Sequence, residues 1–187
     1  MSNVTGLESD ARVVRTQNDV LRAALQLLVE QGWEAVTHAR VAAAAGYSRA
    51  TLYNHWPTRQ ALLHGALSRL ADMPHATSTG DLRTDLVAEL IAYRDGMAEH
   101  RLDRALAVLI DLAASQPEMA PVRDRIVADG EGYVRRLLGP VLPPEQVEAT
   151  TLLLCGAVLQ AALLHGEPPS DEMIKLTVDL VLRGVAP

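Results

Sequence analysis

The chain has 187 residues, which is enough for one domain or two small ones with a real hydrophobic core. Hydrophobic residues make up 49% of it, which excludes a disordered protein. Aromatic residues amount to 3% and phenylalanine is absent, so packed helices of Leu, Val and Ala are favoured over a β-sandwich. The formal net charge of -6, taken alone, argues weakly against binding to nucleic acid.

The charge is unevenly distributed along the chain, and this reverses that argument. Residues 12–69 hold seven arginines against three acidic residues, a net charge of +4. Residues 71–187 hold ten basic residues against eighteen acidic ones, a net charge of -8. A basic amino-terminal part on an acidic body is typical of a protein that binds DNA with one half only, with chance clustering as the alternative.

Several functional classes lack their sequence signals. We find no apolar run of membrane-spanning length free of charge and no signal-peptide core at the amino terminus, so a cytoplasmic protein is expected, with no membrane partner. The single Cys155 lies in an apolar run and indicates a small buried hydrophobe rather than a reactive thiol. The six histidines lack metal-ligand spacing, and no nucleophile stands beside a base, so we expect no metal, no cofactor and no enzyme activity.

In chain order, residues 1–11 are polar and predict a disordered tail. Apolar residues then recur at helical spacing from about Arg12 to Gln31, and Gly32 ends this first helix. A second, very short helix is predicted over residues 38–45, with Thr37 as its N-cap. Gly46 follows at the position where helices commonly end in the left-handed conformation that glycine adopts freely.

A third helix is predicted over about residues 49–55. Ser48 offers a hydroxyl to cap its start, and Pro57 prevents it from continuing beyond Trp56. Two short helices around a glycine turn form the helix-turn-helix layout, in which the second helix enters the major groove of DNA. We therefore expect Leu52 and Trp56, four residues apart, to face inward and the rest of the helix to face DNA.

The run A-x-A-G-Y-S-R-A-T-L-Y-N-H-W-P-T-R-Q-A-L-L, residues 43–63, resembles the DNA-binding signature of the TetR family of transcriptional regulators. The resemblance extends over about residues 12–70, whereas the carboxy-terminal part has no comparable motif. It implies contacts to the DNA backbone by Thr37, Arg40, Tyr53 and His55, with a solvated surface arginine as the alternative for Arg40.

Two positions depart from the family pattern. The family usually places a phosphate-binding lysine where this chain has Arg59, and the retained charge implies a retained contact. Tyr47 stands where the family more often has valine, and it is either a core substitution, which we favour, or an additional phosphate contact.

Base contacts follow from side-chain chemistry. Arg49 can pair with guanine O6 and N7, Asn54 can bind adenine, and Ala50 or Thr51 can touch a thymine methyl group. The expected DNA-binding set is Thr37, Arg40, Tyr47, Ser48, Arg49, Ala50, Thr51, Tyr53, Asn54, His55 and Arg59.

A fourth helix, from about Thr58 to Ala71, completes the amino-terminal domain, residues 12–72, which we call the head. By resemblance this helix joins the head to the body and sets the position of the head. Residues 73–80 have the composition of a linker. Residues 81–187 form the body, a helical ligand-binding and dimerisation domain, which makes an all-α protein of about nine helices.

The helix predicted over residues 144–165 is apolar on all sides, because Gln160 is the one strongly polar residue between Leu152 and Leu164. It and the last helix, about residues 171–183, indicate a homodimer through a four-helix bundle, with a buried central helix in a monomer as the alternative. The expected interface residues are Leu152, Gly156, Leu159, Gln160, Leu163, Met173, Leu176 and Leu180.

The body also offers candidates for an effector pocket, mostly apolar with two phenol hydroxyl groups, each with simple core packing as the alternative. They are Tyr93, Met97, Leu109, Leu112, Met119 and Tyr133. We expect a small, apolar effector and a repressor that releases a palindromic operator in double-stranded DNA when this effector binds. A helical small-molecule carrier or enzyme, or an interaction adaptor without specific DNA binding, is the alternative.

Overall fold

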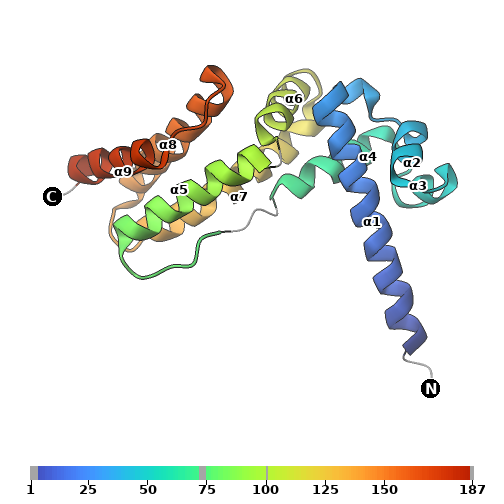
Figure 1. Ribbon diagram of the computed structural model, residues 1–187, viewed down its shortest axis with the longest axis horizontal. Coiled ribbons are helices and arrows are strands. Elements are labelled where there is room, and N and C mark those ends of the chain that lie inside the picture. The colour runs from blue at the N-terminus through green and yellow to red at the C-terminus, as the bar shows by residue number, and fades with distance from the viewer. Residues whose placement is uncertain (1–3, 72–74, 100, 186–187) are drawn as a thin grey trace.

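The computed structural model describes the backbone of residues 4–71, 75–99 and 101–185, and the side chains of residues 11–70, 75–99 and 101–184. Within these residues all regular structure is helical, with nine α-helices joined by loops and short helical turns (Figure 1). The all-α prediction of about nine helices is therefore confirmed.

The head contains α1 (Val4–Gln31), α2 (His38–Ala45), α3 (Arg49–His55) and α4 (Arg59–Ser68). Helix α1 begins at Val4 rather than at Arg12, so the disordered tail predicted for residues 1–11 is wrong from Val4 onward. The stretch contains no proline, and a helix that has already nucleated extends by one hydrogen bond per residue. Figure 1 shows α1 running past α4, with α2 and α3 beside it.

The core of the head is built by faces with helical periodicity. Val20, Ala24 and Leu28 lie four residues apart on α1 and are completely buried. They pack in one cluster with Leu52 of α3 and with the apolar face of α4 that includes Leu63. This packing leaves the opposite side of α3 free to face a partner.

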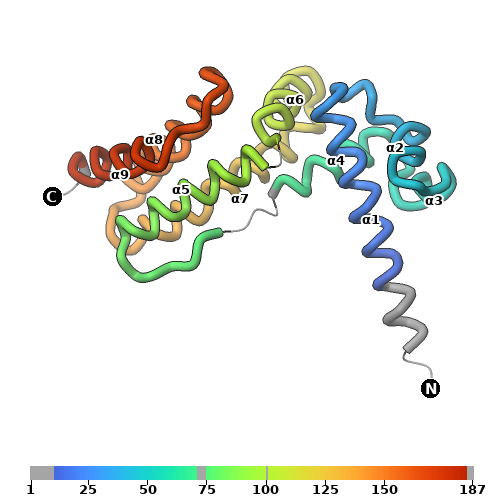
Figure 2. The backbone as a smooth tube through the Cα atoms, viewed as in Figure 1, coloured from blue at the N-terminus to red at the C-terminus, as the bar shows by residue number. Residues whose placement is uncertain are grey.

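Five helices form the body. They are α5 (Leu82–Glu99), α6 (Leu102–Ser115), α7 (Ala120–Leu138), α8 (Pro144–Gln160) and α9 (Asp171–Val185). Helix α5 packs against both α7 and α9, and α8 packs against α9 (Figure 2). The pair α8 and α9 lies at the end of the molecule that is farthest from α3.

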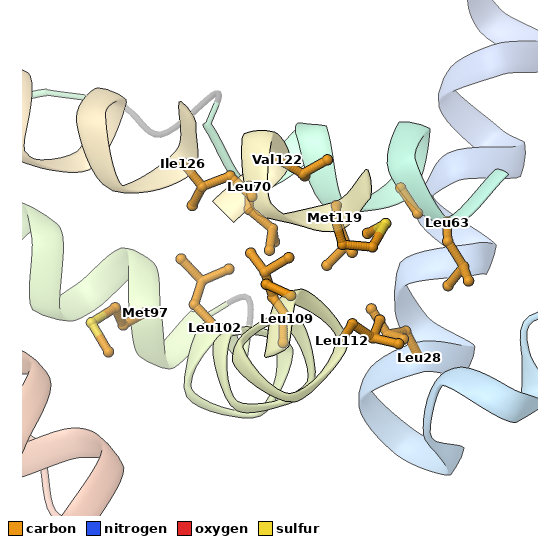
Figure 3. Close-up of a cluster of buried hydrophobic side chains, with 14 of the residues drawn as sticks. Leu28, Leu63, Leu70, Met97, Leu102, Leu109, Leu112, Met119, Val122 and Ile126 are labelled. Carbon is orange, nitrogen blue, oxygen red and sulfur yellow. The ribbon is translucent and has the colours of Figure 1, made fainter. Parts of the chain in front are cut away.

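The head and the body share one hydrophobic core. Helix α1 contacts α6, and α4 contacts α7. Figure 3 shows the continuity, with Leu28 of α1 beside Leu112 of α6, and Leu70, at the end of the α4 segment, beside Leu109. The orientation of the head is therefore coupled to the packing of α6 and α7.

The predicted linker is anchored to α5. Residues 72–74 lie outside the described residues, and residues 75–80 have no regular structure. Buried Asp85 of α5 accepts hydrogen bonds from Ser78 Oγ (2.6 Å), from the backbone N and Oγ1 of Thr79 (2.7 Å each) and from Gly80 N (3.1 Å). One carboxylate thus holds three consecutive linker residues.

A second buried carboxylate holds the start of this segment. Glu89, one turn along α5, accepts a hydrogen bond from Ala76 N (2.9 Å), and its Oε1 lies 2.8 Å from His75 Nδ1. Tyr133 of α7 donates its hydroxyl to Ala76 O (2.8 Å) and stacks on the His75 ring at 4.8 Å between centroids. We call residues 75–80 the strap, because side chains of two body helices hold it in place.

The end of α8 differs from a regular helix. A π-helical turn, η4 (Ala161–His165), continues α8, and Gly166 ends it in the left-handed conformation with φ of 71°. Among the described residues, the continuous helical stretch Pro144–His165 is long and apolar enough, by length and composition, to cross a membrane, with mean hydropathy 1.8. Because this stretch contains Glu145 and Glu148, it does not contradict the expectation that no charge-free apolar run reaches membrane-spanning length.

Candidate nucleic-acid interface

Local side-chain caps set the geometry of the helix-turn-helix. Thr37 Oγ1 accepts a hydrogen bond from Arg40 N (3.3 Å) at the start of α2, and Gly46 ends α2 with φ of 74°. Ser48 Oγ accepts from Thr51 N (3.1 Å) at the start of α3. The N-cap and C-cap positions expected from the sequence are therefore confirmed.

Helix α3 presents a polar outer face. Arg49, Ala50 and Asn54 are exposed, whereas Leu52 is completely buried. Because successive residues of a helix turn by about 100°, Leu52 fixes which residues point outward. Ser48 is exposed at the start of this face, and Thr51, which is half-buried, lies at its margin.

The ring of Tyr53 is held by a residue that the sequence did not single out. Tyr53 is 51% exposed, and its ring stacks on the ring of His38 at 4.0 Å between centroids with 10° between the planes. His38 is buried, with Nε2 2.6 Å from Trp56 O. The stack links α2 to α3, and no spacing in the sequence indicates it because the two residues are fifteen positions apart.

Two further expected contact residues are oriented by α1. The guanidinium of Arg40, which is exposed, donates to the side-chain oxygen of Gln31. His55 is half-buried, with Nδ1 3.5 Å from Gln17 Nε2, and its ring lies at 5.5 Å from the ring of Trp56. Both side chains therefore border the α3 face without lying at its centre.

The Arg59 side chain is bonded inside the head. Its Nε donates to Val36 O (2.9 Å) and its Nη2 to Trp33 O (2.6 Å), and the guanidinium lies 4.5 Å from the centroid of the Trp33 ring. The planar fork of arginine supplies the two donors from two different nitrogens in a fixed geometry. These contacts indicate a structural role for Arg59, and they do not test the phosphate contact that the resemblance implies.

Tyr47 likewise packs within the head. Its hydroxyl donates to Asp19 Oδ2 (2.9 Å), and its half-buried ring packs against the core. Of the two alternatives for this residue, these contacts favour the core substitution.

The head carries several exposed arginines. Arg12, Arg15 and Arg22 of α1 are exposed, and so are Arg40 and Arg49. Of these, Arg22 has a weak ion pair with Asp19 at 3.8 Å. Exposed cations around a polar reading surface suit the phosphate backbone of DNA, which dominates the affinity of such interfaces.

Comparisons with known proteins agree with this geometry. The family model described as "Bacterial regulatory proteins, tetR family" matches residues 20–66. The HTH-type transcriptional regulator AlkX of Mycobacterium tuberculosis (strain H37Rv) is 34% identical over 174 residues, which cover 88% of this chain and 81% of AlkX. This chain belongs to the TetR family. It is therefore a helix-turn-helix DNA-binding transcription regulator and not an enzyme, as predicted.

Solved structures of TetR-family members show the same fold. The TetR family transcription regulator SCO0332 is 30% identical, with a TM-score of 0.63 over 92% of this chain and 99% of that one. The flavonoid-responsive regulator FrrA is 21% identical, with a TM-score of 0.69 over 92% of this chain and 98% of that one. The second likeness supports the fold alone.

The TetR-family body contains three described cavities. The inner cavity, about 50 Å³, lies among α5, α6, α7 and α8, and both Tyr93 and Met97 line it. The outer cavity, about 260 Å³, lies between the α5–α6 junction and η4, and Met97 lines it too. A third, about 290 Å³, lies between α8 and α9 and includes Gln160 and Met173.

The other predicted pocket residues lie elsewhere. Leu109, Leu112 and Met119 belong to the core shared with the head and line none of these three cavities, which favours simple core packing for them. The apolar face of α6 that carries two of them packs against α1. Tyr133 holds the strap.

An exposed apolar face covers the outer side of α8 and α9. Leu152 is 68% exposed, and Met173, Leu176 and Leu180 are each at least half exposed, with Gln160 among them. Gly156 and Leu163 are half-buried. The sequence prediction omitted Leu153 and Leu164, which are among the most exposed leucines, although their apolar character on α8 was a usable signal.

Leu159 does not belong to that face. It is half-buried, packs against the core and lines the inner cavity. The prediction placed it at the dimer interface because a helix that is apolar all round does not reveal which side is covered from within the same chain.

Proposed function

We propose that this chain is a homodimeric, effector-responsive repressor that binds a palindromic operator through α3 and releases it when a small apolar molecule binds the body. The observation that carries the proposal is the outer face of α3, whose polar residues are held outward by the buried Leu52. Arg49 and Asn54 read base edges, and Ala50 and Thr51 touch thymine methyl groups.

The backbone contacts come from the surroundings of α3. Thr37 and Arg40 lie at the start of α2, whose free N–H groups and partial positive charge suit a phosphate. Ser48, Tyr53 and His55 add contacts at the two ends of α3. Arg59 and Tyr47 act indirectly, because their polar groups are bonded within the head.

The dimer forms through the exposed face of α8 and α9, with a second copy of this chain as the partner. Leu152, Leu153, Met173, Leu176 and Leu180 are each at least half exposed, and an apolar area of this extent on a water-facing surface indicates an interface. A two-fold axis through such a four-helix contact places two heads at a fixed separation. This separation suits an operator with two-fold symmetry.

Effector response requires a physical connection between the body and the head. The shared core of α1 with α6 and of α4 with α7 supplies one, and Leu70, at the end of the α4 segment, lines the inner cavity. A ligand shifts the equilibrium only if it binds one head position more tightly than the other. The responsiveness that the name of FrrA states for that protein agrees with this proposal. The site of action is the cytoplasm, where the operator is.

Selection of bound sequences from random duplex DNA tests the proposal. The full-length protein is expected to enrich a palindrome, and the complex is expected to contain two copies of the chain. An enriched sequence without two-fold symmetry would contradict the dimeric reading. If folded, dimeric protein enriches no sequence at all, that result would overturn the proposal that α3 reads DNA.

A further inference from the structure

We propose that the effector is a neutral apolar molecule with a hydroxyl group, which enters through the outer cavity and places this hydroxyl between the side chains of Tyr93 and Glu131 in the inner cavity. This inference rests on the proposed effector response and names the ligand class and the site. Its basis is the chemistry of the cavity walls and the position of one methionine.

The walls of the inner cavity are almost entirely apolar. Helices α5 to α8 supply them, together with the short helical turn η2 (Arg69–Ala71), which follows α4. The apolar lining residues are Leu70, Met97, Leu102, Leu106, Ile126, Val127 and Leu159, beside Gly130. The two polar side chains of this lining are Tyr93 and Glu131, so an occupant is apolar except where it meets them.

The Tyr93 hydroxyl is available to a ligand. It has no hydrogen-bond partner in the part of the chain that the structure describes. Burial raises the pKa of Tyr93, and the nearby Cys155 and Glu131 raise it further. The phenol therefore stays protonated and can both donate and accept a hydrogen bond. Gly130 lies beside the ring, where a Cβ would make an ordinary van der Waals contact with Tyr93 Cε2 at 3.5 Å.

The Glu131 carboxylate selects a hydrogen-bond donor. Its Oε2 accepts from Arg135 Nη2 at 2.6 Å, and its Oε1 has no bonded partner among the described residues. A ligand hydroxyl can therefore donate to Glu131 while it accepts from Tyr93. A carboxylate in the same place would bring a second anion beside Glu131 in an apolar cavity, which is strongly unfavourable.

Met97 separates the two cavities. The inner cavity, about 50 Å³, is smaller than a cavity of roughly 150 Å³ that is known to bind benzene. Met97 lines both it and the outer cavity of about 260 Å³. Because methionine has three rotatable bonds and adapts its shape easily, its side chain can turn aside and join the two spaces.

An occupant of the inner cavity also touches the connection to the head. Leu70 lines the cavity from η2, directly after α4, so an occupant that displaces it bears on α4. Ligand binding and head position are then linked through one side chain. The ligand favours the head position in which Leu70 makes room for it.

Calorimetry on the full-length dimer, with three probes that differ in one group, tests the inference. The probes are 4-ethylphenol, ethylbenzene and 4-ethylbenzoate. We expect 4-ethylphenol to bind most tightly and 4-ethylbenzoate most weakly. We also expect Tyr93→Phe to weaken 4-ethylphenol about threefold to tenfold and to leave ethylbenzene unchanged. Tyr133→Phe is the matched control, because that phenol is bonded to Ala76 in the strap, and it should change neither affinity.

Two outcomes overturn the ligand class. One is 4-ethylbenzoate binding at least as tightly as 4-ethylphenol, and the other is an unchanged 4-ethylphenol affinity in Tyr93→Phe. Operator affinity is measured separately with and without 4-ethylphenol. If 4-ethylphenol binds but leaves operator affinity unchanged, the site is supported and the effector response of the proposed function is contradicted. If 4-ethylphenol does not bind while the protein still binds its operator, the site alone is overturned.

Discussion

Arg59 and Arg40 carry the same charge and lie near the same DNA-facing surface, but their surroundings differ. The guanidinium of Arg59 donates to two backbone carbonyls and covers the Trp33 ring, whereas Arg40 is exposed and makes one bond, to Gln31. Two of the five N–H donors of the Arg59 guanidinium are therefore bonded inside the head, and the Trp33 ring covers one of its faces. At the scale of single residues, this separates an arginine that stabilises the head from one that contributes to DNA affinity.

Arg59→Ala should lower the free energy of unfolding by about 1–3 kcal/mol, because it removes two hydrogen bonds from a charged group. The slope of log affinity for DNA against log salt should not change. The matched variant Arg40→Ala should do the reverse, with stability preserved and the slope reduced by about one unit. Denaturant unfolding and salt titration measure the two effects. A reduced slope in Arg59→Ala at unchanged stability would restore the phosphate contact.

Arg49→Ala should cost about 1–3 kcal/mol of operator affinity and relax the base preference at one position of each half-site. The physical reason is the loss of a bidentate contact to guanine from the exposed side of α3. Binding to a panel of single-base operator variants measures it. Equal weakening on every sequence would show that Arg49 contacts phosphate instead of a base.

At the scale of elements, features that depend on neighbouring residues could be predicted from the sequence, whereas contacts between residues distant in the sequence could not. The caps at Thr37 and Ser48 and the stop at Gly46 depend on neighbouring residues, and all three are present. The Arg59 bonds and the strap join residues that are distant in sequence, so periodicity could not indicate them. Leu109 and Leu112 of α6 were predicted as pocket residues, but apolar character does not tell whether a side chain meets a cavity or another helix.

Leu180→Glu should convert the dimer to a folded monomer, because it places a charge on the exposed face of α9, where the side chain is 58% exposed. Ile110→Glu is the control, an exposed apolar residue on α6 outside that face. Sedimentation velocity measures the oligomeric state, and circular dichroism verifies folding. A Leu180→Glu variant that still sediments as a dimer would place the interface elsewhere.

The strap predicts a pH dependence of stability. The hydrogen bond from Ser78, followed by those from Thr79, lowers the pKa of Asp85 from 3.8 to about 2. Asp85 therefore adds stability that is fully present above pH 4 and is lost as the pH falls toward 2. Asp85→Asn should have a lower melting temperature than the unchanged protein at pH 7. Its melting temperature should also decrease less between pH 4 and pH 2. Asp111→Asn, at an exposed site on α6, is the control and should have the same melting temperature as the unchanged protein at each pH. If Asp85→Asn also melts like the unchanged protein at each pH, Asp85 does not anchor the strap.

At the scale of the whole molecule, the structure places a reading surface at one end and an unpartnered apolar face at the other, joined by one continuous core. The sequence predicted both ends from motif and composition. The resemblance implied that α4 joins the head to the body, but the sequence did not predict the contact of α1 with α6, because the shared core depends on which helices of head and body meet. In the proposed dimer, specific DNA reading therefore depends on dimer formation, because the contact at the far end positions each head.

The most direct measurement compares operator affinity for the selected palindrome and for the same palindrome with about 5 additional base pairs, half a helical turn, between its half-sites. The α8–α9 dimer fixes the separation of the two heads, so the added half-turn should reduce affinity toward the non-specific level, on the order of 10³-fold or more. Equal affinity for the two DNAs would show that the heads bind independently and would contradict the account.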